Sequence, residues 1–317
     1  MRTLFFALAF LAAGAAQAQE YPSRPIRVVV PYSAGGSSDG PMRVIAQEMS
    51  KQLGQQMVVE NKPGQGAMLG SADVVKAPPD GYTLLLASNP NAISASLYSR
   101  LTHDPVEDFA PISLLASEQA VLLVHPSVPA RTVPELIAYV KARPGKVDYS
   151  SSGNGSAQHL FMAMFTSMTG IQMNHIPYKG SAQAVTDLLG GQVSAAMPGL
   201  AAMRGHIREG RARALAVTGA KRASAAPEIP TMMEQGMKDY ELYVWMGMLA
   251  PKGTPNAVID RLHREFVSAL RAPAVKTFME GAAIEAVGST PAEFGRFFRE
   301  EKVRWAKIIK ETGARID

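Results

Sequence analysis

A glycine- and serine-rich turn near the N-terminus carries the clearest chemistry in this sequence. It runs Pro31-Tyr32-Ser33-Ala34-Gly35-Gly36-Ser37-Ser38-Asp39, between an apolar stretch and a helical pattern. Adjacent glycines let the backbone approach a ligand closely, and the amides that open the following helix favour an anion. The serine hydroxyls add donors. The turn is neither a P-loop nor a dinucleotide fingerprint. The alternative interpretation is an ordinary strand–helix turn with a serine-rich cap.

A second turn of the same kind is Ser150-Ser151-Ser152-Gly153-Asn154-Gly155-Ser156, which leads into Ala157-Gln158-His159. The same amide and hydroxyl argument applies to it, and so does the same alternative. Two anion-type turns in two different sheets would hold the two ends of one acidic molecule. His159 lies at a helix start, where a capping or core histidine is a commoner role than a general base.

Two further polar positions follow predicted strands. Tyr178 and Lys179 stand at a strand end before a helix, and the lysine would supply a positive charge for a carboxylate. Asn89 follows the strand expected at 82–88 and is a similar candidate. For Lys179 the competing interpretation is a solvated surface lysine.

The sequence holds no pattern typical of catalysis or of a bound metal. There is no G-x-S-x-G and no H-E-x-x-H, the 6 histidines are scattered, and cysteine is absent. The missing cysteine excludes thiolate metal sites, iron–sulfur clusters and a cysteine nucleophile. We therefore expect no catalytic residues, no metal and no cofactor, which favours a binding protein over an enzyme.

Apolar periodicity predicts strands that alternate with helices. In the helix expected at 39–53, the apolar positions form one stripe, with Asp39 as a plausible N-cap and Gly54 as the stop. Capping boxes at Thr132, Thr231 and Thr290 predict further helix starts. The other expected helices are 69–77, 156–169, 181–189, 200–209 and 254–271, and Gly313 closes the last. The expected strands are 26–31, 57–60, 82–88, 113–116, 121–125, 147–151, 173–178, 193–197, 214–218 and 240–249.

This alternation with short loops predicts an α/β fold with mostly parallel sheets. A strand, a Gly/Ser turn and a helix occur at 26–53 and again at 147–169. Two such units in separate sheets would face each other across a cleft, because ligands of open α/β sheets bind at the carboxyl ends of the strands.

Composition and the first residues set the class of protein. The chain has 317 residues, 47% hydrophobic and 19% charged, which fits a globular chain of roughly two domains. A net charge of +5 is small for this length and gives no indication of nucleic-acid binding. Residues 1–18 read as a Sec signal peptide with Arg2 at the start and Ala16-Gln17-Ala18 at the end. This signal would direct export to a bacterial periplasm, with cleavage before Gln19. The alternative is that residues 1–18 stay uncleaved as a membrane anchor.

A series of short motifs resembles one known family. They begin with Tyr21-Pro22-x-Arg24-Pro25-Ile26, Val30-Pro31-Tyr32 and Gly35-Gly36. They continue with Val59-Glu60-Asn61-Lys62-Pro63-Gly64, Pro79-Asp80-Gly81-Tyr82-Thr83-Leu84, Pro177-Tyr178-Lys179-Gly180, Leu189-Gly190-Gly191-Gln192-Val193 and Ala250-Pro251-x-Gly253-Thr254-Pro255. In this order the chain resembles the substrate-binding proteins of tripartite tricarboxylate transporters, also called the Bordetella uptake (Bug) family.

The resemblance implies a two-lobed periplasmic binding protein fold of type II-like architecture that closes on a small carboxylate. The lobes would be 19–121 with 247–317, and 122–246. Membrane subunits of a tripartite tricarboxylate transporter would be the partners, and the protein is expected to be a monomer. The expected ligand-binding residues are Tyr32, Ser33, Ala34, Gly35, Gly36, Ser38, Asp39, Asn89, Ser152, Gly153, Asn154, Ser156, His159, Tyr178 and Lys179.

The sequence departs from the family pattern at a few positions. Tyr32 and Ala34 stand where the family often has Phe and Pro, which leaves the identity of the carboxylate open. Ala67 and Met42 replace usual small residues and are interpreted as packing changes. Two other functions stay open. One is a ligand-sensing module for a two-component system, which its genomic neighbours would reveal. The other is a periplasmic enzyme on a Rossmann-like fold, which would need a nucleophile–base pair.

Overall fold

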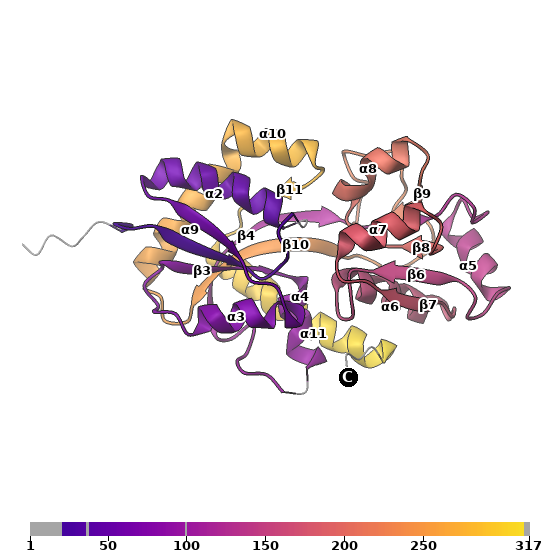
Figure 1. The fold of residues 1–317 in the computed structure, drawn as a ribbon, viewed down its shortest axis with the longest axis horizontal. Coiled ribbons are helices and arrows are strands. Elements are labelled where there is room, and N and C mark those ends of the chain that lie inside the picture. Colours follow the sequence, from indigo (N-terminus) through magenta and orange to yellow (C-terminus); the bar gives the residue numbers. More distant parts are fainter. Residues whose placement is uncertain (1–20, 36–37, 99, 314–317) are drawn as a thin grey trace, which may run out of the picture.

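The computed structural model describes residues 21–35, 38–98 and 100–313 of the chain. Two α/β lobes lie side by side along the long axis (Figure 1), so the expected two-lobed fold is confirmed. The expected signal peptide, 1–18, lies outside the described residues. No helix in the described part of the chain is long and apolar enough to cross a membrane.

The first lobe is built on a six-stranded sheet with the order β11-β4-β10-β3-β1-β2. Its strands are β1 (Ile26–Val30), β2 (Met57–Asn61), β3 (Thr83–Ser88), β4 (Phe109–Gln119), β10 (Tyr243–Pro251) and β11 (Glu285–Ala286). Its helices are α2 (Asp39–Leu53), the 3-10 turn η1 (Gln65–Ala67), α3 (Met68–Val75), α4 (Asn89–Leu97), α9 (Asn256–Arg271), α10 (Pro273–Gly281) and α11 (Pro291–Thr312).

The second lobe has a five-stranded sheet with the order β7-β6-β8-β5-β9. Its strands are β5 (Val121–Val124), β6 (Asp148–Ser151), β7 (Asn174–Pro177), β8 (Ala195–Ala196) and β9 (Arg213–Val217). Its helices are α5 (Val133–Lys141), α6 (Ala157–Thr169), α7 (Ser181–Leu189) and α8 (Leu200–Arg208).

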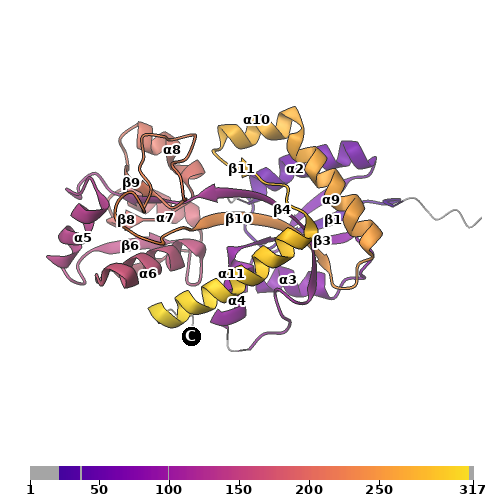
Figure 2. The ribbon, with the colours of Figure 1, turned by 180° about the vertical axis from the view of Figure 1, so that it is seen from behind.

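Both sheets are mixed, which corrects the expectation of mostly parallel pairing. In the first sheet β1 runs parallel to β2 and β3, whereas β10 is antiparallel to β3 and β4. In the second sheet β6 is parallel to β7 and β8, whereas β5 is antiparallel to β8 and β9. The crossings between the lobes explain the antiparallel half of the first sheet. β4 leads the chain out of the first lobe and β10 brings it back beside β4 (Figure 2).

The strongest sequence signals gave accurate helix boundaries. Helix α2 spans the predicted 39–53 and ends at Gly54, whose backbone is left-handed. Thr290 and Glu293 form the predicted reciprocal cap of α11. The box at Thr231 is a correction: the Thr231 amide donates to Glu234 at 2.7 Å and the Glu234 amide donates back at 3.0 Å, but the chain forms only a turn there. Helices α4 and α10 were not predicted.

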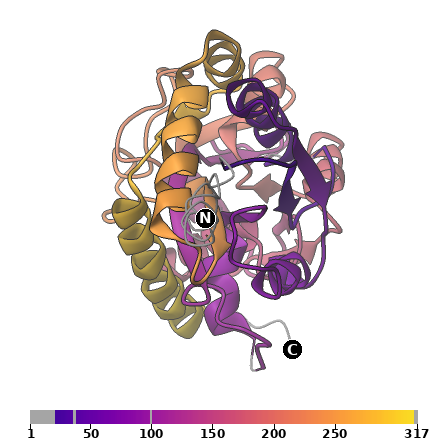
Figure 3. The ribbon, with the colours of Figure 1, turned by 90° about the vertical axis from the view of Figure 1, so that its left-hand side faces the viewer.

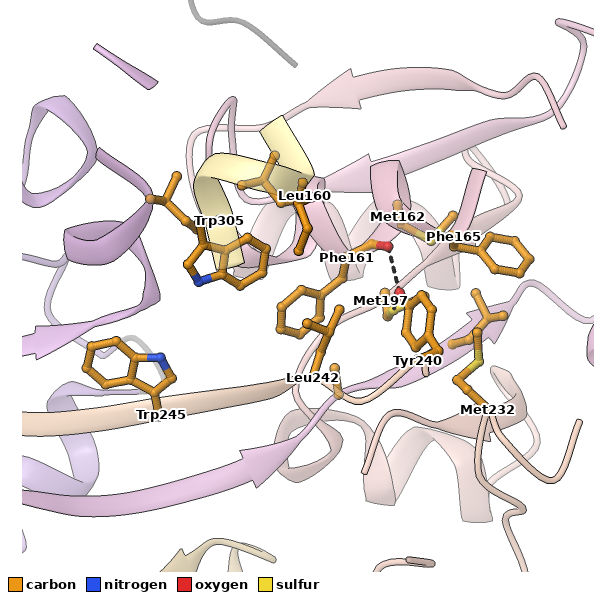
Figure 4. Close-up of a cluster of buried hydrophobic side chains, with 14 of the residues drawn as sticks. Leu160, Phe161, Met162, Phe165, Met197, Met232, Tyr240, Leu242, Trp245 and Trp305 are labelled. Atoms are coloured by element: carbon orange, nitrogen blue, oxygen red, sulfur yellow. Dashed lines mark hydrogen bonds between the residues drawn. The ribbon is translucent and has the colours of Figure 1, made fainter. Parts of the chain in front are cut away.

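The apolar core is continuous between the lobes on the side of α11 (Figure 4). Trp305 of α11 stacks on Phe161 of α6 with ring centroids 5.9 Å apart. The Tyr240 hydroxyl donates to the Phe161 carbonyl at 2.6 Å. Glu301 of α11 accepts from the indole nitrogens of Trp245 and Trp305, each at 2.9 Å. Helix α11 therefore packs against both lobes, and Figure 3 shows it running along one side of the first lobe.

Candidate functional site

The first turn is shaped from inside by Asp39. This carboxyl is buried and accepts from the Gly35 amide at 2.9 Å, from Arg43 Nε at 3.0 Å and from Asn61 Nδ2 at 2.9 Å. Burial raises its pKa, but these hydrogen bonds outweigh burial and hold the pKa below its ordinary value. Asp39 is thus an ionised organiser of the turn, and its oxygens are already occupied. Gly35 adopts φ +76°, which favours glycine there.

The outer edge of the first turn is open to solvent. Ser33, Ala34 and Gly35 are exposed, and Gly36 lies outside the described residues. Ser38 precedes α2, and its hydroxyl makes no capping bond. Tyr32 points inward instead: its hydroxyl donates to Asn91 Oδ1 at 2.9 Å, and burial raises its pKa. This hydroxyl connects the turn to α4, and the phenylalanine that the family often has at position 32 could not make the bond.

The second turn is organised by its own backbone. The Gly153 amide donates to Ser151 Oγ at 3.1 Å, and Gly153 has φ +128°, where a Cβ would lie 3.2 Å from the Tyr178 carbonyl. The Ser156 hydroxyl caps α6 by accepting from the His159 amide at 3.3 Å. Ser152 is half-buried and Asn154 is exposed, so these two residues form the accessible edge of the turn.

Beneath this turn lies a stack of three rings. His159 stacks on His175 with centroids 4.0 Å apart, and His175 stacks on Tyr149 at 4.9 Å. The Gly155 amide donates to His159 Nδ1 at 3.1 Å, so that nitrogen carries no proton. Burial lowers the pKa of His159, and burial together with His159 lowers that of His175 to about 4. His159 is therefore a neutral residue that supports the turn.

The third candidate segment adjoins the second turn because β6 and β7 pair in parallel. The Tyr178 amide donates to the Ser151 carbonyl at 3.0 Å. The Tyr178 hydroxyl donates to Asp187 at 2.7 Å, and burial followed by that carboxylate raises its pKa to about 12. Lys179 is exposed beside the start of α7, and no ion pair involving it occurs among the described residues.

Asn89 is held by hydrogen bonds to a neighbouring strand. Its side chain is fully buried, donates to the Tyr243 carbonyl at 3.0 Å and accepts from the Trp245 amide at 3.2 Å. Both bonds fix the start of α4 to β10. Asn89 therefore connects α4 to β10, and its role as a ligand-binding residue stays a prediction.

Sequence reasoning missed a left-handed loop at the carboxyl end of β2. Four consecutive residues have positive φ: Gly64 at +141°, Gln65 at +47°, Gly66 at +57° and Ala67 at +77°. Their carbonyls are held by serines, since Ser94 donates to Gly66 at 2.9 Å and Ser71 donates to Ala67 at 2.8 Å. Ala67, where the family usually has glycine, is buried and adopts a backbone conformation that favours glycine, and its interpretation as a packing change stays a prediction.

A buried glutamate at the lobe junction was also missed. Glu118 lies at the end of β4, is 7% exposed and accepts from the Ala201 amide at the start of α8 at 3.3 Å. It lines a small pocket of about 20 Å³, room for one water-sized group. Ser38 of the first turn lines the same pocket, with Trp245 and Val244 of β10. Burial raises the pKa of Glu118 to about 7. Its sequence signal was an acid at the end of an apolar strand.

The structure thus brings the candidates into two groups. The second and third segments join in the second lobe, whereas Ser38 of the first turn lines a pocket with Glu118 of β4, and Glu118 in turn contacts the start of α8. On the same side Arg204 of α8 donates to the Gly281 carbonyl of α10 at 3.0 Å. Within residues 21–35, 38–98 and 100–313, no group of three His, Cys, Asp or Glu side chains is placed to hold a metal ion.

Solved structures share this architecture. BugD, described as a periplasmic binding protein, superposes with TM-score 0.84 at 35% identity, covering 93% of this chain and 99% of BugD. R. palustris Rpa4515 with adipate superposes with TM-score 0.86 at 33% identity over 93% of this chain and 99% of that one. MatC from Rhodopseudomonas palustris with bound malate gives 0.84 at 27%, over 91% of this chain and 100% of MatC. The fold is that of a periplasmic solute-binding protein.

The sequence comparisons define the family. The model of the tripartite tricarboxylate transporter family receptor matches residues 42–314. Protein BugT of Bordetella pertussis is 39% identical over 315 residues, which cover 99% of this chain and 96% of BugT. The chain belongs to the tripartite tricarboxylate transporter receptor family, so the resemblance drawn from its motifs is confirmed.

Proposed function

We propose that this protein captures a small carboxylate between its lobes and delivers it to the membrane subunits of a tripartite tricarboxylate transporter. The observation that supports the proposal is that each lobe carries one glycine- and serine-rich turn between a strand and a helix, before α2 in the first lobe and before α6 in the second. In the first turn Ser33, Ala34 and Gly35 are exposed, and in the second Asn154 is exposed. Helix starts of this kind favour anions.

The relatives support a carboxylate as the ligand. Adipate and malate, which occupy two structures of the same fold, are both dicarboxylates. Lys179 adds a positive charge beside the second turn. A diacid whose carboxylates contact both turns would interact more strongly with closed lobes than with open ones, and this difference in affinity drives closure.

The remaining parts of the proposal follow from the same role. Residues 1–18 act as a Sec signal peptide, the mature protein begins at Gln19 and resides in the periplasm, and it works as a monomer. Binding and release need no catalytic residue, metal or cofactor, and the proposal assigns none.

A thermal-shift screen over small acids tests the ligand class. A ligand at 100 times its dissociation constant stabilises the folded protein by about 2.7 kcal/mol. We expect diacids to raise the melting temperature and neutral sugars and amides to leave it unchanged. If only neutral compounds raise the melting temperature, the ligand is not a carboxylate.

A matched pair of glycine variants tests the turn. Gly153 and Gly170 stand before and after the same helix, α6, with φ +128° and +63°. Alanine at either position costs about 1–3 kcal/mol of stability, because both backbones are unfavourable for alanine. Only Gly153→Ala is expected to weaken binding of the best diacid, measured by calorimetry. Equal affinity of the two variants would remove the second turn from the site.

A further inference from the structure

The Glu118 carboxyl is buried without a charged partner. Its contact is the Ala201 amide at 3.3 Å, and among the described residues no ion pair involves it. A Cβ on Gly199 would lie 2.5 Å from Glu118 Oε1, so the glycine leaves the space that the carboxyl occupies. An unpaired buried carboxylate costs several kcal/mol, which makes such a group a candidate for function.

The charged groups on the surrounding elements are engaged elsewhere or exposed. Arg204 of α8 donates to the Gly281 carbonyl, and Arg43 of α2 pairs with Asp39. Glu285 of β11, which pairs with Ser117 beside Glu118, is exposed. On β10, the Tyr243 hydroxyl accepts from the Ala220 amide at 3.0 Å. Among the residues that the structure describes, no lysine, arginine or histidine forms an ion pair with Glu118.

The pocket beside Glu118 is built for one small group. Glu118 pairs with Val244 and Ala116 with Met246, so all four lie on one face of the sheet, since alternate residues of a strand share a face. The pocket they line with Ile284 and Ser38 holds about 20 Å³. A hydroxyl or an ammonium group fits that room, but a second carboxylate does not and would face a like charge.

We propose that the ligand carries a hydrogen-bond donor, a hydroxyl or an ammonium group, beside one of its carboxylates, and that Glu118 accepts from this donor. The inference rests on the proposed function and narrows its ligand to α-hydroxy or α-amino diacids. The neighbouring carboxylate then lies at the first turn, next to Ser38. Plain aliphatic diacids leave Glu118 without a partner and bind more weakly.

Calorimetry with diacids matched in length tests this class. The four-carbon set is succinate, malate and aspartate, and the five-carbon set is glutarate, 2-hydroxyglutarate and glutamate. We expect wild-type protein to bind a donor-bearing acid at least tenfold more tightly than the plain acid of the same length. Equal or tighter binding of the plain acids overturns the inference while the proposed function stands. Binding of no acid at all overturns the proposed function itself.

Variants at Glu118 show whether the donor group of the ligand is an ammonium or a hydroxyl. Glu118→Gln keeps an acceptor but removes the charge, so an ammonium ligand loses at least tenfold in affinity and a hydroxyl ligand loses less than threefold. Glu118→Leu removes the acceptor and abolishes the preference for either. Glu285→Gln, a neighbouring exposed carboxyl on β11, is the control and leaves both affinities unchanged. An unchanged preference in both Glu118 variants contradicts the inference.

Proton release separates a ligand contact from a structural role. Burial raises the pKa of Glu118 to about 7, so at neutral pH part of the protein holds the proton. An ammonium ligand requires the ionised form and expels that proton. Calorimetry in two buffers of different ionisation enthalpy is expected to detect release of a fraction of a proton with aspartate or glutamate, and none with Glu118→Gln. For an ammonium ligand, release that persists in Glu118→Gln excludes Glu118 as the contact.

Discussion

Two buried glutamates stand at the junction of the lobes and are supported in opposite ways. Glu301 of α11 accepts from the indoles of Trp245 and Trp305 and pairs with Arg304 at 3.2 Å. Glu118 of β4 has one backbone amide at 3.3 Å. Burial raises the pKa of both groups, to about 7 for Glu118. The same residue type therefore has two indole donors and an arginine as partners on one side of the junction, and a single backbone amide on the other.

The lobes contact each other differently on the two sides of their junction. On the α11 side aromatic rings from both lobes pack into one core. On the α8 side the hydrogen bonds between the lobes include those of Glu118 with Ala201 and of Arg204 with Gly281. Apolar packing resists separation more than isolated polar contacts do, so we expect the lobes to move apart on the α8 side.

The largest effect is expected from removing the supported glutamate. Glu301→Ala leaves two buried indole donors without acceptors, at about 1–3 kcal/mol each, so the free energy of unfolding falls by about 4 kcal/mol. Urea denaturation measures the loss. Glu300→Ala, an exposed neighbour on α11, serves as the control. Equal stability of the two variants would show that the indole bonds contribute nothing.

A smaller and pH-dependent effect is expected at Glu118. Its folded pKa of about 7 lies above the ordinary value of 4.5, so the folded state keeps a proton that the unfolded chain releases. The contribution of the Glu118 proton to the free energy of unfolding is fully present below pH 4.5 and is lost as the pH rises through 7. The loss is roughly 3 kcal/mol at pH 8, because each pKa unit corresponds to about 1.4 kcal/mol. Glu118→Gln is expected to be more stable than wild type at pH 8 and nearly equal at pH 5. Parallel stability–pH curves would contradict this prediction.

The smallest effect on stability is expected from the polar contact between α8 and α10. Arg204→Ala removes a bond to the Gly281 carbonyl at the surface, so the free energy of unfolding changes by less than about 0.5 kcal/mol. Without that bond the ligand-free lobes separate more readily, and small-angle scattering is expected to give a larger radius of gyration than for wild type. Arg208→Ala, exposed on the same helix, is the control. A radius of gyration equal to that of wild type would show that the bond between Arg204 and Gly281 does not hold the ligand-free lobes together.

Helices whose apolar stripe or cap lies within a short stretch of sequence were predicted well. Helix α2 combined an apolar stripe with Gly54, and α11 combined a capping box with Gly313. The Thr231 box failed as a helix start because reciprocal cap bonds also stabilise an isolated turn. Strand direction was beyond local patterns, since a buried strand reads alike in parallel and antiparallel pairing.

The ligand-binding residues of the candidate site stay a prediction, and the sequence did not reveal which of them hold the turns in place. The glycine-rich turns were visible because they follow strands and open helices. Which side chains are already occupied depends on partners far along the chain, as with Asn89 and Tyr243, 154 residues apart. Glu118 was missed for the same reason: the acid at the end of an apolar strand is visible in the sequence, but its contact with the start of α8, more than eighty residues later, is not.

The pairing of Trp245 with Trp305 through one carboxylate has an optical consequence. The chain has 2 tryptophans, and both donate to Glu301 at the lobe junction. Trp245 also lines the Ser38–Glu118 pocket. All of the indole emission therefore originates where the lobes meet, and its wavelength depends on the charge and hydration of that place. The protein therefore carries a built-in spectroscopic reporter, and the proposed closure of the lobes is expected to change its emission without any attached dye.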